Sequence, residues 1–549
     1  MSIGVGATAA LLLFAVWPLA AVLRTALADG GAPLLAELAE PGAHEAWFNT
    51  LVLAGWVTGL AVPLGATLAW VVERTDAFVS ERTRGATGAL LTLPLAVPPY
   101  LLAMAWALLG NGRNGLLNRI ASAPWVDLYG LDGIVLVLVT ASYPFVLLAV
   151  RASLSRADPA LEEAARTAGA GPVRVLIDVT IPLVLPSMAA AAGLVFVFAT
   201  AAFGVPYLLG SVASPPVYFL TTRIFRYTTL GGEDMLARAA ALAIVLLATS
   251  GLAQAASSWL AKRRSTVQVS GKSSRPSLVR LGPLRFFVRA GLALFALTAI
   301  VLPLSTIAWT SLAKSFAEPG TLSFVHWNNV LAREETLGAF VHSIVLALLT
   351  GALVAVLGLV VARMAKVTRR AGAVVSFLAS APYAVPGTVL AIGLLLAFSL
   401  EYRVIVADRV TFALYLPGTL GLLIVAYGVK YLAFGVRGAR AALDQIHPSL
   451  EEAARTSGAG PLRGTVDVLL PLVSPAVLAA FVVVALPCLS ELTMSVLLFG
   501  AHTQTAGTLL FELQSYADPP AASVVATLVV GIALVGDFLS RRLSRRRTT

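Results

Sequence analysis

The sequence predicts an all-α membrane protein that crosses the bilayer about twelve times, as two homologous six-helix units in parallel repeat. Of its 549 residues, 58% are hydrophobic and 12% are charged, which is far from the composition of a soluble domain. Apolar runs of roughly 20 residues recur along the chain, and each is long enough to cross a bilayer as a helix. The short alternating segments of a membrane-spanning barrel do not dominate. In addition, one polar segment occurs twice.

The apolar runs give the expected spans, six in each half of the chain. In order, they lie near residues 5–24, 47–72, 88–109, 131–150, 184–209, 238–260, 286–312, 341–362, 373–398, 413–435, 475–499 and 521–539. In the first span Pro18 predicts a bend, and the lack of basic residues before Arg24 argues against a cleavable signal peptide. A basic, serine-rich stretch between the halves predicts a flexible linker. The expected domains are therefore a first unit (1–262), a cytoplasmic linker (263–283) and a second unit (284–549).

The loops between the spans alternate in charge. The loops after the even-numbered spans, together with the C-terminal tail, hold 28 of the 39 Lys and Arg residues against 12 acidic residues, whereas the opposite loops hold ten basic and sixteen acidic ones. Because basic loops stay on the cytoplasmic side, we expect both termini in the cytoplasm. The net charge of +11 then reflects topology, and no nucleic-acid partner is expected. The single cysteine, Cys488, excludes a disulfide framework and a cysteine metal site.

The polar segment that occurs twice lies in two of the loops predicted to be cytoplasmic. Residues 162–186 and 451–475 align without gaps, and 17 of the 25 positions are identical. The two copies follow the fourth and the tenth expected spans. A polar segment kept in duplicate within an apolar chain is more typical of a contact surface than of a simple connection.

Each copy carries the signals of a helix–turn–helix. In the first copy, Asp158 can cap a helix whose first turn begins with proline and contains two glutamates, residue types that suit the positive end of the helix dipole. Gly169 can adopt the positive φ that ends this helix. A second short helix is expected to begin at Pro172 and to stop at Pro182. The second copy repeats the pattern, with His447 as a weaker cap.

The expected helix of each copy presents small side chains. In the first copy, the residues that share one helical face are Leu161, Ala164, Ala165 and Ala168. Alanines let another protein approach closely, and the Glu and Arg residues beside them can pair with its charges. The alternative is an amphipathic elbow that rests on the membrane, but such an elbow would carry Leu, Phe or Trp on this face.

Both copies resemble the signature of permease subunits of binding-protein-dependent ABC importers: Glu-Ala-Ala, three residues, Gly, nine residues, then Ile-x-Leu-Pro. The matching residues are Glu163, Ala164, Ala165, Gly169 and Val179 to Pro182 in the first copy, and Glu452, Ala453, Ala454, Gly458 and Val468 to Pro471 in the second. Only the aliphatic positions depart, and they do so conservatively. The resemblance covers essentially the whole chain, as a fused pair of permease units, and is strongest to the ferric-iron importer group.

The resemblance implies a non-catalytic transport subunit of a prokaryotic inner membrane. In that family the loop is a coupling helix seated in a groove of a separate ATP-binding subunit, so two copies of a cytoplasmic ATPase are implied. ATP and Mg would bind to that partner, and no cofactor or metal site is expected in this chain. An extracytoplasmic solute-binding protein would deliver the cargo. The implied coupling residues are Glu162, Glu163, Ala164, Ala165, Gly169, Glu451, Glu452, Ala453, Ala454 and Gly458.

Ferric iron is the cargo that the resemblance implies, with thiamine or a 2-aminoalkylphosphonate as alternatives. The expected spans hold no ligand set for a ferric ion, so selection would fall to the binding protein. A twelve-helix secondary transporter is the rival class. It would carry a Gly-x-x-x-Asp-Arg-type pattern between the second and third spans, where residues 73–84 have none, and it leaves the duplicated loop unexplained.

Three residues within the spans are candidates for the translocation path, which a parallel repeat places between the halves. Pro98 and Pro386 stand at equivalent places in the third and ninth spans and free backbone carbonyls, which membranes tolerate only against protein or a wet cavity. A packing kink explains them equally well. Glu491 in the eleventh span aligns with Ala202 of the first half. It either attracts a cation or latches a gate, or it is a buried carboxylate bonded to neighbouring helices.

Overall fold

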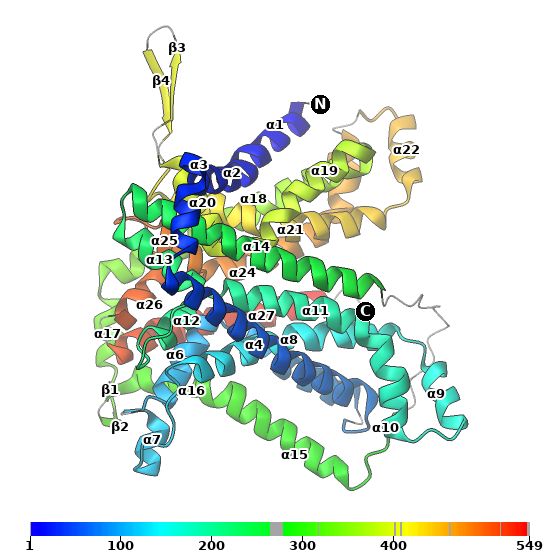
Figure 1. Ribbon diagram of the computed structural model, residues 1–549. Coiled ribbons are helices and arrows are strands. Elements are labelled where there is room, and N and C mark those ends of the chain that lie inside the picture. The colour runs from blue at the N-terminus through cyan, green and yellow to red at the C-terminus, as the bar shows by residue number, and fades with distance from the viewer. Residues whose placement is uncertain are drawn as a thin grey trace. The chain divides into compact units, whose positions relative to one another are not determined.

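The computed structural model describes residues 2–78, 80–112, 114–263, 278–316, 318–399, 402–406, 409–414, 416–460, 463–515 and 518–545, so most of the predicted linker lies outside the described residues. The described chain is almost entirely helical (Figure 1). Its strands form two antiparallel hairpins, β1 (Ala313–Ser315) with β2 (Glu318–Leu322), and β3 (Tyr402–Val406) with β4 (Arg409–Leu414). The predicted all-α polytopic fold is confirmed.

Ten helices in the described part of the chain are long and apolar enough to cross a membrane. They are Thr8–Ala26, Pro41–Arg74, Leu131–Arg156, Pro172–Ala201, Glu233–Arg263, Leu284–Leu312, Glu334–Val367, Leu420–Asp444, Gly464–Leu489 and Pro519–Phe538. An eleventh candidate is a pair of helices, Ala371–Ala384 and Gly387–Phe398, which are bent by 111° relative to each other. Each of these spans corresponds to one that the apolar runs predict.

The third and ninth predicted spans are broken, and the expectation of a single helix at 88–109 and at 373–398 is wrong. The first divides into α5 (Glu81–Leu91), the 3-10 turn η2 (Leu93–Ala96) and α6 (Pro99–Leu109). The second divides into α19 (Arg369–Ser380), the 3-10 turn η5 (Ala381–Ala384) and α20 (Gly387–Phe398). The two breaks fall at Pro98 and Pro386, because proline cannot donate a helical hydrogen bond and holds the preceding residue in an extended conformation.

The chain forms two compact units, which we call unit 1 (residues 1–43, 223–247 and 311–549) and unit 2 (residues 44–222 and 248–310). Four helices pass from one unit to the other: α4 (Pro41–Arg74), α13 (Leu220–Leu230), α14 (Glu233–Arg263) and α16 (Leu302–Leu312). The other helices of unit 2 are α5, η2, α6, α7 (Leu116–Ala121), α8 (Leu131–Arg156), α9 (Pro159–Thr167), α10 (Pro172–Val175), η3 (Leu176–Thr180), α11 (Ile181–Ala201), α12 (Gly204–Gly210), α15 (Leu284–Ala296) and η4 (Leu297–Val301). Those of unit 1 are α1 (Ser2–Leu11), η1 (Leu12–Val16), α2 (Trp17–Ala26), α3 (Ala28–Leu38), α17 (Val325–Leu331), α18 (Glu334–Val367), α19, η5, α20, α21 (Leu420–Asp444), α22 (Pro448–Thr456), η6 (Gly464–Leu469), α24 (Leu470–Leu489), α25 (Thr493–Leu498), α26 (Ala506–Ser515) and α27 (Pro519–Arg545).

The first helix of each sequence half packs within the unit that the other half builds. In unit 1, the ring of Phe14 stacks on Phe398 of α20, with ring centroids 5.7 Å apart. In unit 2, Phe295 of α15 meets Tyr143 of α8 edge to face at 5.4 Å. The predicted boundaries at 262 and 284 describe the sequence repeat and stay a prediction, whereas the spatial units exchange their first helices.

The start of α15 is fixed to the loop that follows α4, both within unit 2. Val279 pairs with Thr75 in a parallel bridge, and the carboxylate of Asp76 accepts hydrogen bonds from the Arg285 guanidinium and the Leu281 amide. The Arg285 hydrogen bond holds the pKa of Asp76 below its ordinary value. Because the folded-state pKa is lowered, this contact stabilises the fold above the ordinary carboxyl pKa and weakens as the pH falls.

Polar contacts at the start of the second helix occur in matching form in both units. In unit 2, the Asn49 side chain donates to the Tyr218 carbonyl (3.1 Å), and the Thr50 hydroxyl accepts from the Leu220 amide (3.0 Å). In unit 1, the ring of His342 donates to the Gln504 carbonyl (2.9 Å), and the Ser343 hydroxyl accepts from the Ala506 amide. The imidazole of His342 therefore joins α18 to the segment that precedes α26.

Glycines allow the second and fourth long helices of each half to approach closely. In unit 2, a methyl group added at Gly65 of α4 would lie 2.7 Å from Cβ of Val146 in α8. In unit 1, a methyl group added at Gly358 of α18 would lie 2.8 Å from the backbone nitrogen of Val436 in α21. Close backbone contacts of this kind favour helix association in a membrane, because helices surrounded by lipid gain no hydrophobic free energy when they associate.

Prolines inside four long helices are accommodated by π-turns. The turns η1, η3, η4 and η6 each end two residues before a proline, namely Pro18, Pro182, Pro303 and Pro471. In all four, the residue before the proline donates its amide to the carbonyl five residues earlier. The wider turn absorbs the proline ring, which would clash with the carbonyl four residues back in a regular α-helix.

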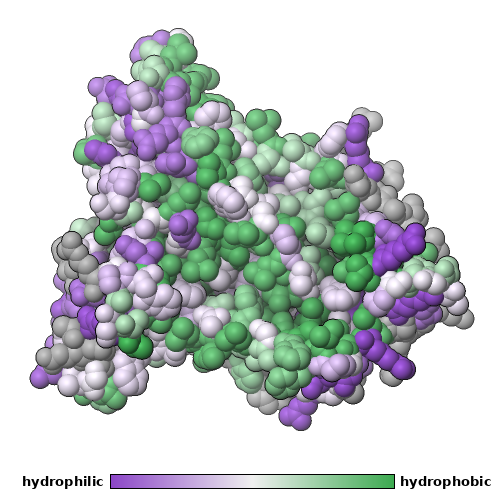
Figure 2. Space-filling model, turned by 60° about the horizontal axis from the view of Figure 1, so that its bottom comes forward, coloured by the Kyte–Doolittle hydropathy of each residue, from purple (hydrophilic) through white to green (hydrophobic). Residues whose placement is uncertain are grey.

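Apolar residues cover much of the face that Figure 2 shows, and several large apolar side chains are exposed. Trp56 of α4 is 59% exposed, and Phe286 and Phe287 of α15 are 72% and 68% exposed. Such areas are a liability in water but are the expected surface of a helix that faces hydrocarbon.

Substituting alanine at the close-approach glycines tests this packing. We expect Gly65→Ala and Gly358→Ala to lower the thermal stability of the purified protein, because overpacking a tight contact costs roughly 1–3 kcal/mol. Gly55→Ala and Gly338→Ala are matched controls on the same two helices, since a methyl group at either site meets nothing within 4 Å. Equal melting temperatures for the two pairs of variants would refute the close-approach role.

Candidate functional site: the duplicated elbows

The first copy of the repeated segment folds as a helix and a turn, which we call the first elbow (residues 158–182, in unit 2). The Asp158 carboxylate caps α9 by accepting from the Ala160 amide (2.9 Å). At the other end, Gly169 has φ +88° and donates its amide to the Arg166 carbonyl, while Ala170 donates to Ala165. A positive φ and these reversed bonds form a glycine C-cap, as the sequence predicts.

The second copy, in unit 1, forms a matching capped helix and glycine turn (the second elbow, residues 447–471, of which 461 and 462 lie outside the described residues). The ring of His447 accepts from the Ser449 amide at 3.3 Å, a longer cap bond than that of the aspartate. Gly458 has φ +83°, and its amide and that of Ala459 donate to the Arg455 and Ala454 carbonyls. Both elbows are therefore closed by the same bonds at equivalent residues.

The chain after each turn departs from the sequence prediction. Pro182 does not stop the second helix: α10, η3 and α11 follow one another without a break, so that residues 172–201 form one long helix. The amide of Ile181 donates to Leu176, five residues back, and this π-turn makes room for the proline. In the second elbow, η6 leads into α24 past Pro471 in the same way.

The outer surface of the elbows contains most of the predicted coupling residues. Exposed in the first elbow are Glu163, Ala164 and Gly169, and in the second Glu452, Ala453 and Gly458. Ala165 and Ala454 are half-buried. Leu161 and Leu450 add apolar surface, at 50% and 44% exposure. The side chain of Glu451 lies outside the described residues.

Glu162 faces inward, away from any docking surface. Its side chain is 4% exposed and forms an ion pair with Arg74 at the end of α4 (Nε to Oε1, 3.1 Å). The side chain of Arg74 is 3% exposed. The Thr180 hydroxyl donates to the same oxygen (3.1 Å), and Arg166 lies 3.8 Å from the other. Glu162 thus ties α9 to the end of α4 and to η3.

The same arginine also fixes the helix that leads into the elbow. The second guanidinium nitrogen of Arg74 donates to the Leu154 carbonyl near the end of α8 (3.0 Å). In unit 1 the equivalent carbonyl, Leu443, accepts from Lys366 at the end of α18 (3.0 Å). In the sequence, Arg74 and Lys366 count only among the basic loop residues that indicate membrane orientation, and the sequence did not predict that they anchor the helices before the elbows. The one signal for this role is that both cations lie in the last turn of the second long helix of their half.

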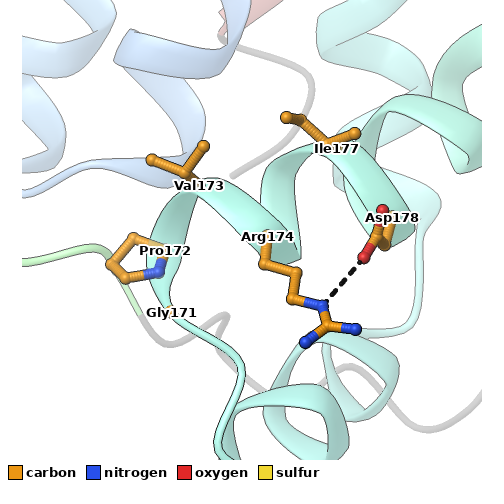
Figure 3. A pocket seen from close by; sticks show the side chains of 6 residues that line it. All are labelled: Gly171, Pro172, Val173, Arg174, Ile177 and Asp178. Carbon is orange, nitrogen blue, oxygen red and sulfur yellow. Dashed lines mark hydrogen bonds and ion pairs between the residues drawn. The ribbon is translucent and has the colours of Figure 1, made fainter.

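A hollow of about 430 Å³ lies on the first elbow beside the start of the long helix (Figure 3). Val173 and Ile177, which are 69% and 55% exposed, point to one side of this segment. Arg174 and Asp178 lie together on the other side, joined by a 3.3 Å ion pair. The hollow therefore offers apolar contact area with charges at its edge, the composition of a protein-docking patch.

The three path candidates lie at helix breaks. Pro98 and Pro386 precede the first residues of α6 and α20. Glu491 occupies a break between α24 and α25 in unit 1, where its carboxylate accepts from the Met494 and Ser495 amides (2.9 and 3.1 Å). Among the described residues, no group of three or more His, Cys, Asp or Glu could hold a metal ion.

Twin elbows on an apolar helical scaffold, each closed by the same glycine turn and exposed at the same positions, define the class as a polytopic membrane protein with a duplicated docking elbow. The chain belongs to the family of binding-protein-dependent transport system inner membrane components, whose model matches residues 61–266 and 354–549. The two matches each contain one elbow and one broken span.

Similar proteins come from the same family. The ferric transport system permease protein FbpB of Actinobacillus pleuropneumoniae is 26% identical over 472 residues, covering 83% of this chain and 65% of that protein, so the chain spans just under two thirds of its length. The Fe(3+)-transport system permease protein FbpB 2 of Haemophilus influenzae is 27% identical, covering 92% and 91% of the two chains. The molybdenum transport system permease protein ModB of Escherichia coli is 30% identical over 39% of this chain and 93% of its own.

Removing Glu162 should release the first elbow. We expect Glu162→Ala to increase trypsin cleavage after Arg166 and Arg174 by an order of magnitude or more, because breaking a buried ion pair costs roughly 3–5 kcal/mol. Glu163→Ala is the matched control, because Glu163 is the adjacent residue and its carboxylate is exposed. Peptide mass analysis of the digest measures both rates. If the two variants are cleaved equally fast, Glu162 does not hold the elbow.

Proposed function

We propose that this chain is the transmembrane subunit of an ATP-driven importer and that its two elbows receive force from ATP-binding subunits. The supporting observation is the pair of elbows, which share N-terminal caps, glycine turns and an exposed Glu-Ala pair at equivalent positions. A connecting loop needs no such duplication. An exposed helix with small side chains, rigidly tied at Glu162 to the long helices, is suited to transmit a push from one protein into another.

The motor lies on partner chains in this proposal. Two copies of a cytoplasmic ATP-binding subunit, which carry ATP and Mg, each hold one elbow, and this chain hydrolyses nothing. Closure of the two ATPases around ATP draws the elbows together and opens the path to the outside, where a binding protein releases its cargo. The excess of Lys and Arg in the loops on the side of the elbows supports a cytoplasmic position for the elbows and for both termini in this proposal.

Ferric iron is the cargo that we propose. The named cargo of the two iron permeases, which cover most of this chain, supports it. Thiamine or a 2-aminoalkylphosphonate is the alternative, and a 2-aminoethylphosphonate permease of Salmonella typhi matches 36% of the chain at 27% identity. Selection among these rests with the binding protein, because the described residues contain no metal-ligand cluster. A twelve-helix secondary transporter remains the alternative from another class, and it would have no use for an ATPase.

Copurification tests the proposal directly. The tagged chain, purified in mild detergent from its native membrane, should retain an ATPase. The rate of ATP hydrolysis by this ATPase should fall when it is separated from the tagged chain. Glu163→Arg together with Glu452→Arg should weaken this retention at least tenfold, because both exposed carboxylates reverse charge at a docking surface. The control reverses an exposed acid on another segment, Glu233→Arg. Purification of the native chain with no ATPase would overturn the importer proposal.

Strain at the elbow glycines should uncouple transport from ATP hydrolysis. Gly169→Val with Gly458→Val places β-branched residues at φ +88° and +83°, which costs roughly 1–3 kcal/mol at each site and displaces the turn. We expect uptake to fall while membrane insertion persists. Gly171→Ala is the matched control, since its φ is −68° and a methyl group there meets nothing within 4 Å. Full uptake by the valine variant would show that the elbows are not the coupling surface.

A further inference from the structure

Lys430 is a cation in the middle of a membrane span. It lies in α21 (Leu420–Asp444), far from either end of the helix, and the other charged residues of α21 all lie in its last third. The positive-inside count assigns every other Lys and Arg of the chain to a loop or the tail and leaves this one out. A charge at such a depth is costly and, by default, marks a function.

The side chain of Lys430 reaches the place where two broken helices of unit 1 meet. A methyl group added at Gly387, the first residue of α20, would lie 3.3 Å from the Lys430 ammonium. The same point is 3.4 Å from Thr493 and 3.6 Å from Met494, in the first turn of α25. The ammonium therefore lies between the break at Pro386 and the break at Glu491.

This ammonium has no protein hydrogen bond and no ion pair within 4 Å among the described residues, and the lysine residue is half-buried by its surface exposure. Its compensating charge is Glu491, with which it interacts at longer range. One Glu491 oxygen already accepts from the Met494 amide, the Ser495 amide and the Ser495 hydroxyl. Glu491 is thus held as a helix cap and leaves the donors of Lys430 unused.

The first half lacks every polar member of this arrangement. Around Lys430 and Glu491, a fully buried tyrosine, Tyr427, shares a 2.5 Å hydrogen bond with Ser495. The residues aligned with Tyr427, Lys430, Glu491 and Ser495 in the first half are Leu138, Ala141, Ala202 and Pro206. The helix breaks themselves are present in both halves, so the fold does not require the polar residues. They belong to a task that only the second half performs.

The first turn of α20 offers two further kinds of donor. The start of α20, a helix of 12 residues, directs its positive end and its unpaired amides toward the same break. Thr388 in its first turn is fully buried, and its hydroxyl has no hydrogen-bond partner. A cationic ammonium, a bare glycine backbone and a helix N-terminus together favour an oxyanion, and they repel a naked metal cation.

We propose that Lys430, with the first turn of α20, binds an oxyanion group of the cargo, a carboxylate or a phosphate. This proposal rests on the importer function above and refines its cargo: ferric iron would cross as an anionic chelate instead of as the bare ion. Glu491 then fixes α25 and balances the lysine when the site is empty, and its own role is positioning.

Chemical modification of Lys430 tests the site without any transport. Purified protein is treated with an amine-acetylating reagent, and the acetylation rates of Lys430 and of the exposed Lys314 are measured by mass spectrometry. Citrate or pyrophosphate, at millimolar concentration and matched ionic strength, should slow acetylation of Lys430 at least threefold and leave Lys314 unchanged. Chloride is the control anion. No selective protection by either oxyanion would overturn the proposal.

Uptake measurements separate this proposal from the importer proposal. Cells that contain the complete transporter are given radioactive iron as ferric citrate or as a ferric hydroxamate complex without negative charge. Lys430→Met should reduce ferric citrate uptake roughly tenfold or more, as expected for one lost charge-assisted hydrogen bond, and Lys430→Arg should restore most of it. Copurification of the ATPase should be unchanged in both variants.

The outcomes are distinct. If Lys430→Met loses ferric citrate uptake and Lys430→Arg does not, the oxyanion site is supported. If Lys430→Met and native protein take up ferric citrate equally, the oxyanion site fails while the importer function stands. If the native protein copurifies with an ATPase but takes up neither iron complex, the iron cargo fails, and the acetylation measurement still decides whether Lys430 binds an oxyanion.

Discussion

The buried ion pair between Arg74 and Glu162 is the interaction on which the first elbow depends. Both side chains are almost completely removed from water, at 3% and 4% exposure. A charge buried in this way is tolerated only when its partners are in place. Arg74 contributes a second bond to the Leu154 carbonyl, so one guanidinium holds the ends of α4 and α8 and the start of α9 together. The elbow is therefore a rigid extension of the long helices, and a force applied to it reaches them directly.

The two halves of the chain keep the same frame and differ in what they place inside it. The elbow caps, the glycine approaches at Gly65 and Gly358, and the helix breaks at Pro98 and Pro386 recur in both units. The polar residues around Lys430 and the helix break at Glu491 occur only in the second half. The two units therefore share their turns, close approaches and helix breaks, and they differ in the polar residues at one of those breaks.

Much of this architecture could be predicted from the sequence, because its signals are local. Apolar length gives the spans, and Gly169 with Asp158 gives the limits of α9. The breaks at Pro98 and Pro386 were visible as prolines, yet hydropathy alone could not separate a kink from a sharp break. Glu162 illustrates a second limit. Nothing in the local sequence distinguishes Glu162 from its exposed neighbour Glu163, and only the ion pair with Arg74, 88 positions earlier, holds Glu162 inward. Contacts over such separations leave no local pattern.

The π-turns before Pro18, Pro182, Pro303 and Pro471 change which side of each helix the later residues face. A π-turn inserts roughly one extra residue, and each residue of an α-helix turns by about 100°, so a helical wheel drawn through the turn is out of phase beyond it. A residue of α24 assigned to the lipid face from η6 onward would in fact lie about a quarter-turn or more away. Cysteine-scanning and spin-label studies of these four helices therefore require a separate wheel on each side of the proline.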